Sequence, residues 1–257
     1  MSTYLPPQHG AWAFLTLPLA LGAVTAPWTP LFLLLAVAWV AAYPWSYAAL
    51  GLIRAKRPQR FRRPFLVWLA IVFPAVMVLV VARPWLAWVG LAYLALFVIN
   101  LRYAKRNDER AMVNELVFAA ECSAMVVVTW SVGAGGRSLT PPEFDTVPDR
   151  VWVLMIVCFL VLVGSTLHVK SLVRERRDAR YARVSRAVAV ASIPVSVALA
   201  DWWGWPGGAW LVGPFVAAAV RAFVVGRRPL RPGVIGLIEL GGFVLFALAS
   251  VLAATTA

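Results

Sequence analysis

The densest group of cationic side chains in the chain lies between Lys170 and Tyr181, directly after a long apolar run. Arginine guanidinium groups form paired hydrogen bonds that suit phosphate oxygens, so this segment could hold an anionic headgroup or a diphosphate. Glu175 and Asp178 stand among the cations, and on a helix Asp178 would be close enough to Arg174 for an ion pair. A solvated loop crossed by ion pairs is the alternative interpretation of the same residues.

Three other basic segments separate apolar runs, and the four segments together hold 21 of the 24 Lys and Arg residues. Cytoplasmic loops of membrane proteins carry the excess of Lys and Arg, so we expect all four segments to face the cytoplasm. The candidate anion- or diphosphate-binding residues are Arg54, Lys56, Arg57, Tyr103, Lys105, Arg106, Lys170, Arg174 and Arg177.

Polar residues inside the apolar runs form a second group of candidates. A charged side chain at mid-bilayer costs roughly 2.5–3.5 kcal/mol on insertion scales, so we expect each such residue to have a structural or functional role. Asn107, Asn114 and Glu121 recur every seven residues and would share one face of a helix. They form either a polar seam between helices or the wall of an inner cavity. The candidate cavity residues are Tyr47, Asn114, Glu115, Glu121, His168, Ser171, Glu175 and Asp178.

Motifs for metals and cofactors are missing from the sequence. Cys122 and Cys158 lie inside apolar runs without the spacing of a zinc site or a disulfide framework. The two histidines form no HxxxH pattern, and there is no P-loop, GxGxxG or GxSxG. We therefore expect no metal site and no cofactor.

Nine apolar runs must position these residues, each near the roughly 20 residues that span a bilayer as a helix. We expect helices at 11–26, 31–53, 65–82, 85–101, 112–132, 151–169, 187–203, 209–225 and 234–253. With the basic segments inside, the N-terminus is cytoplasmic and the C-terminus is outside. The sequence thus predicts an all-α, polytopic membrane bundle of about nine helices, forming a single integral membrane domain over residues 1–257.

Composition supports this class. The chain is 62% hydrophobic and only 14% charged, which is too apolar for a soluble domain. Its net charge of +13 could suit nucleic acid, but the basic residues flank apolar runs, where they would meet anionic headgroups. We expect the lipid bilayer as the partner, with an anionic lipid or isoprenoid as a candidate ligand, and no nucleic acid.

Three segments resemble those of YwiC-like proteins, a family of uncharacterised bacterial membrane proteins. They are Pro7-Gln8-His9-Gly10-Ala11-Trp12-Ala13, Leu17-Pro18-Leu19-Ala20-Leu21-Gly22 and Val173-Arg174-Glu175-Arg176. The likeness covers nearly the whole chain, and it implies a multi-pass protein of the bacterial inner membrane.

The segment Asn100-Leu101-Arg102-Tyr103-Ala104-Lys105-Arg106 is similar to one in the UbiA superfamily of intramembrane prenyltransferases. That more distant resemblance implies a UbiA-like bundle with its site near the cytoplasmic loops after the second and sixth helices. The superfamily holds magnesium on a prenyl diphosphate through two Asp-rich motifs. Here the segment 47–57 contains no Asp, Glu or Asn, and Glu175 and Asp178 are outnumbered by Arg. Magnesium is therefore disfavoured.

These observations favour a membrane protein that binds an anionic lipid or isoprenoid diphosphate through Arg and Lys at its cytoplasmic side. Residues of the basic segments, such as Tyr47, Lys105 and Arg174, are expected to converge on one chamber. A binding or assembly protein that retains only the scaffold is one alternative, suggested by the missing Asp-rich motifs. An intramembrane prenyl or lipid transferase is a second. A transporter that uses Glu115, Glu121 and Glu239 is a third. The sequence does not decide whether the protein is an enzyme.

Overall fold

The computed structural model describes residues 3–6, 10–106, 111–140, 146–225 and 230–256. Over these residues the chain forms nine helices and no strand, and it divides into two compact units, Met1–Thr146 and Val147–Ala257. Seven of these helices are long and apolar enough to cross a membrane, whereas α1 and α8 are shorter apolar helices. The prediction of an all-α, polytopic membrane bundle is therefore confirmed. The single domain stays a prediction.

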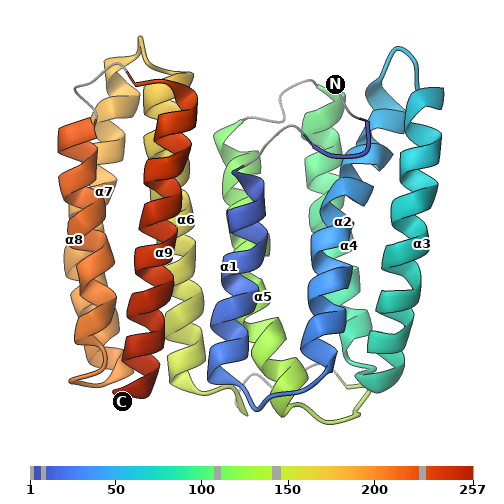
Figure 1. Ribbon diagram of the computed structural model, residues 1–257, viewed down its shortest axis with the longest axis horizontal. Coiled ribbons are helices and arrows are strands. Elements are labelled where there is room, and N and C mark those ends of the chain that lie inside the picture. The colour runs from blue at the N-terminus through green and yellow to red at the C-terminus, as the bar shows by residue number, and fades with distance from the viewer. Residues whose placement is uncertain (1–2, 7–9, 107–110, 141–145, 226–229, 257) are drawn as a thin grey trace. The chain divides into compact units, whose positions relative to one another are not determined.

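The first unit contains five of the described helices. They are α1 (Ala11–Thr25), α2 (Leu31–Arg54), α3 (Gln59–Ala82), α4 (Leu86–Lys105) and α5 (Met112–Ala134). Successive helices run in opposite directions, so the α2–α3 connection and the end of α4 lie at the same end of the unit (Figure 1). Leu35, Leu79, Met125 and Val132 belong to the buried cluster that joins α2, α3 and α5.

Helices α1 and α5 approach each other closely at Gly22. A Cβ atom at this position would lie 2.5 Å from the backbone oxygen of Val126 and 2.6 Å from Cβ of Thr129. Small residues allow the backbones of membrane helices to come together in this way. The segment that ends at Gly22, one of the three that resemble YwiC-like proteins, thus has a packing role in the first unit.

The second unit contains four helices among its described residues. They are α6 (Asp149–Val173), α7 (Ala179–Trp203), α8 (Ala209–Val224) and α9 (Pro232–Thr255). Each helix packs on the next, and α6 also contacts α8 and α9, so the four enclose a common interior. The α6–α7 connection, the end of α8 and the start of α9 lie at one end of this unit (Figure 1).

Several helices begin earlier or end later than the apolar runs predict. Helix α3 starts at Gln59 rather than at residue 65, α7 starts at Ala179 rather than at 187, and α6 continues to Val173. The backbone hydrogen bonds of a helix need no apolar side chain, and arginine can extend its charged end to the membrane surface. Many of the basic residues therefore lie on helix ends and not in loops.

The segment after α6 is a connection and not a continuous helix. Arg174 follows the last residue of α6, and Asp178 precedes α7, where its carboxylate accepts a hydrogen bond from the backbone N–H of Arg180 at 2.8 Å. The helical pairing of Arg174 with Asp178 expected from the sequence is therefore wrong, because Asp178 caps the next helix. Two other predicted features, Pro7-Gln8-His9 and Asn107, lie outside the described residues.

Two arginines outside the four basic segments each tie helix ends together. Arg83 Nε donates to the backbone oxygen of Val132 at 3.1 Å, which joins the end of α3 to α5. Arg150 Nε donates to the backbone oxygen of Trp203 at 3.3 Å, and its guanidinium lies 5.6 Å from the centre of the Trp203 ring. These contacts explain why Arg83 and Arg150 occur at the end of each unit that otherwise has few cations.

Candidate functional site

The second unit contains a cavity of about 240 Å³ between its four helices. The wall is mostly apolar, with Phe215, Phe243 and Phe246 among its residues. The polar side chains on the wall are Ser165 and His168 of α6, Ser185 and Ser192 of α7, Arg221 of α8, and Glu239 of α9. A mostly apolar cavity with a few converging polar groups is typical of a ligand site.

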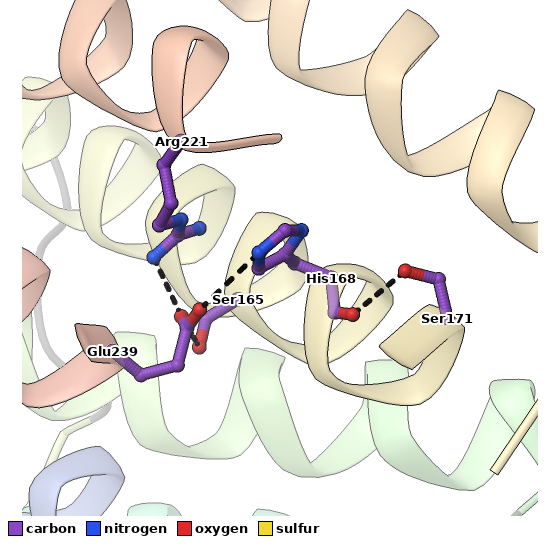
Figure 2. Close-up of polar contacts among 5 residues, drawn as sticks. All are labelled: Ser165, His168, Ser171, Arg221 and Glu239. Atoms are coloured by element: carbon purple, nitrogen blue, oxygen red, sulfur yellow. Dashed lines mark hydrogen bonds and ion pairs between the residues drawn. The ribbon is translucent and has the colours of Figure 1, made fainter. Parts of the chain in front are cut away.

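Four of these polar residues form one cluster around the Glu239 carboxylate (Figure 2). Arg221 Nη1 donates to Oε2 of Glu239 at 2.7 Å, and the Ser165 hydroxyl donates to the same oxygen at 2.6 Å. Nε2 of His168 lies 4.0 Å from the other carboxylate oxygen, Oε1, which is beyond hydrogen-bond distance. Oε2 of Glu239 thus accepts hydrogen bonds from two donors, whereas Oε1 accepts none from the described residues.

The ion pair in this cluster is buried inside the apolar part of the unit. The side chains of Arg221 and Glu239 are 16% and 6% exposed. A single charge in hydrocarbon is expensive, and pairing it with an opposite charge at hydrogen-bond distance removes much of that penalty. Loss of either partner would therefore leave the other charge buried and uncompensated between α8 and α9.

Local sequence explains how the cluster forms. Ser165 and His168 are three residues apart, so they share one face of α6. Arg221 lies in the last turn of α8 and Glu239 in α9, and the two are 18 residues apart across a helical hairpin. A Cβ atom at Gly242 would lie 3.3 Å from Arg221 Nη1, so this glycine leaves room for the guanidinium to reach Glu239.

A second polar cluster joins α4 and α5 in the first unit. Asn100 Nδ2 donates to the two carboxylate oxygens of Glu121 at 3.1 and 3.4 Å, and the Tyr93 hydroxyl donates to the backbone oxygen of Glu121 at 2.6 Å. Glu121 is only 8% exposed. These contacts favour the interpretation of Glu121 as part of a polar seam between helices.

The predicted residues of the first unit lie mainly at its basic end. Tyr47 packs edge-on against Phe61 with ring centres 5.8 Å apart and is half-buried, as are Asn114 and Glu115 in the first turn of α5. Tyr103 is also half-buried. The exposed residues of the set are Arg54, Lys56, Arg57, Lys105 and Arg106.

The predicted residues of the second unit lie at the end of α6 and in the α6–α7 connection. Lys170 and Ser171 are buried, and the Ser171 hydroxyl donates to the backbone oxygen of His168 at 2.7 Å. Arg174, Arg177 and Asp178 are exposed and Glu175 is half-buried. His168 lines the cavity described in this unit, as does Glu239, which the sequence suggests only for the transporter alternative. A chamber shared by residues of both units stays a prediction.

Sequence reasoning missed the main partners in both clusters. Arg221 is not among the candidate residues that the sequence suggests, and Asn100 enters only through the segment that resembles the UbiA superfamily. The spacing of these residues in the sequence could have suggested the contacts. Asn100 and Glu121 lie on two helices joined by one connection, and so do Arg221 and Glu239. In each pair, the two residues lie at similar distances from that connection, to within about one helical turn, so the antiparallel helices bring them to the same level.

The fold and these clusters define a multi-pass membrane protein whose helices bury a few paired polar groups. The family model described as YwiC-like protein matches residues 5–130. "Uncharacterized protein YwiC" of Bacillus subtilis (strain 168) is 30% identical over 249 residues, which cover 93% of each chain. An "Uncharacterized protein" of Haemophilus influenzae is 26% identical over 252 residues, again 93% of each chain. The chain belongs to the YwiC-like family. No solved structure matches it.

Proposed function

We propose that the protein binds an anionic lipid headgroup or an isoprenoid diphosphate through exposed Arg and Lys at the basic ends of its helices. The observation that carries this proposal is the gathering of cations within each unit. Exposed Lys56, Arg57 and Lys105 share one end of the first unit, and Arg174 and Arg177 lie at the end of the second unit where α6 meets α7 (Figure 1). Each such cation near an anionic leaflet contributes about 1 kcal/mol of attraction.

The same arrangement supports a cytoplasmic orientation for the basic ends. Within each unit, the described helix ends and connections rich in Lys and Arg lie at one end, as the positive-inside rule requires of cytoplasmic segments. A reporter that is active only in the periplasm should therefore give a signal when fused after Trp205 and none when fused after Arg180. The reverse pattern would contradict the orientation with the N-terminus in the cytoplasm and the C-terminus outside.

The likeness to the UbiA superfamily at Asn100–Arg106 makes an isoprenoid diphosphate a natural test ligand. We propose that the cations contact the phosphate oxygens directly, because charge-assisted hydrogen bonds from Arg can replace a metal bridge. Among the described residues, no group of three or more His, Cys, Asp and Glu side chains could hold a metal ion.

The test is a titration of the purified full-length protein with geranylgeranyl diphosphate, with and without magnesium. We expect binding in both conditions. Arg174→Ala should lower the affinity about fivefold, because it removes the attraction of one cation, about 1 kcal/mol. Arg137→Ala is the matched control, because Arg137 is also exposed but lies outside the basic segments. Binding that requires magnesium and disappears in Glu175→Ala or Asp178→Ala would instead favour the transferase alternative.

A further inference from the structure

The cavity of the second unit has polar atoms that the protein itself does not satisfy. Nε2 of His168, Nε of Arg221 and Oε1 of Glu239 are buried and have no hydrogen-bond partner within the described part of the chain. All three residues line the same cavity. Buried polar atoms normally find partners, so three unsatisfied atoms on residues that line one cavity indicate a place where a further polar group binds.

The cavity is too large to be explained by a single water molecule. One water needs on the order of 10–15 Å³ of such space, and the cavity offers about 240 Å³. Most of its wall is apolar, so most of an occupant would have to be apolar too. Gly164 and Gly241 line it, and a Cβ atom at either position would meet no atom within 4 Å. The two glycines therefore keep space open beside the cluster.

The position of the cavity indicates that its occupant comes from the bilayer. Ala217, Gly241 and Leu245 line the cavity and are also exposed, and they lie within the apolar helices α8 and α9. Glu239 lies seven residues into α9, which places it roughly 10 Å from the start of the helix. A neutral polar group is stable at that depth, whereas a charged headgroup would have to leave the interface.

The three atoms also define the chemistry of the polar group. Arg221 Nε–H can only donate and Glu239 Oε1, as a carboxylate oxygen paired with Arg221, accepts. His168 Nε2 can do either, depending on its tautomer. A hydroxyl group both donates and accepts. It would donate to Glu239 Oε1 and accept from Arg221 or His168.

We propose that this cavity binds the hydroxyl end of a lipid alcohol. The hydroxyl group lies at the Arg221–Glu239 pair, and the first part of the alkyl chain packs against Phe215, Phe243 and Phe246. The site is separate from the basic helix ends and does not depend on the anion-binding proposal. A long-chain primary alcohol and a diacylglycerol present the same hydroxyl chemistry, and the experiment distinguishes them.

The test uses full-length protein in lipid nanodiscs and a diazirine-bearing hexadecanol, followed by mass spectrometry of the labelled peptides. We expect light-induced labelling on α6, α8 or α9. Unlabelled hexadecanol should compete at least about tenfold better than hexadecyl methyl ether, which has no hydroxyl proton to give to Glu239. Dioctanoylglycerol is the second competitor, and whichever compound competes more strongly identifies the source of the hydroxyl.

Two variants locate the site. Gly164→Leu would place a side chain in the cavity and should lower labelling about tenfold, because the ligand would lose both its space and its hydrogen bonds. Gly236→Leu is the matched control, since Gly236 is exposed, meets no atom within 4 Å and does not line the cavity. His168→Leu should weaken labelling to a smaller extent.

Equal labelling of Gly164→Leu and Gly236→Leu would overturn the proposal, as would equal competition by hexadecanol and its methyl ether. Hexadecyl phosphate provides a further arm. If it displaces the label better than hexadecanol does, the cavity is an anion site and the assignment of an alcohol is wrong. That result would leave the proposal for the basic helix ends untouched, because Arg174→Ala tests it separately.

Discussion

Replacing Glu239 with leucine is expected to lower the free energy of unfolding by about 3–5 kcal/mol. The carboxylate accepts hydrogen bonds from Arg221 at 2.7 Å and from Ser165 at 2.6 Å, inside the apolar part of the second unit. Removing it leaves the Arg221 guanidinium, only 16% exposed, without its counter-charge. The penalty comes from this stranded charge more than from the lost contact.

A double-mutant cycle separates these two contributions. Arg221→Met should also be destabilising, because it leaves the buried Glu239 carboxylate without its counter-charge. The double variant Arg221→Met/Glu239→Leu leaves no unpaired charge, so it should regain much of the lost free energy of unfolding. Unfolding can be followed by circular dichroism in mixed micelles. Glu175→Leu is the control and should change stability by no more than about 0.5 kcal/mol, since Glu175 is half-buried in a connection. Losses that simply add in the double variant would show that the pair is not coupled.

Hydropathy and charge alone predict the helices and their order. Each described helix corresponds to one apolar run, because a bilayer requires its backbone polar groups to be satisfied within the segment. The boundaries of α3, α6 and α7 could not be predicted in the same way. A helix can continue beyond the hydrocarbon, and a residue such as Arg180 in the first turn of α7 can direct its charged end toward the headgroups without ending the helix.

The polar clusters show a different limit. The Arg221–Glu239 and Asn100–Glu121 contacts each join two helices of one hairpin, so sequence spacing could have suggested them. The contact between Ser165 and Glu239 spans 74 residues and depends on how α6 packs on α9. No local pattern reports that packing. The cavity beside it depends on the same packing, which is why His168 could be selected but its surroundings could not.

The α6–α7 connection should contribute strongly to the binding of anionic lipid. Arg174, Arg176 and Arg177 are all exposed there, with the half-buried Glu175 as the acidic neighbour between them. Replacing the three arginines with glutamine removes about 3 kcal/mol of attraction to an anionic leaflet, or on the order of a hundredfold in affinity. The fold should be unaffected, because none of the three side chains is buried.

Native mass spectrometry of the protein released from micelles tests this central claim most directly, by comparing bound phosphatidylglycerol with bound phosphatidylcholine. The wild-type protein should retain phosphatidylglycerol preferentially, the triple glutamine variant should lose much of that preference, and a triple lysine variant should keep most of it because the charges remain. If the glutamine variant retains phosphatidylglycerol as the wild type does, or if the wild type shows no preference for the anionic lipid, the proposal that these basic helix ends bind anionic headgroups is wrong.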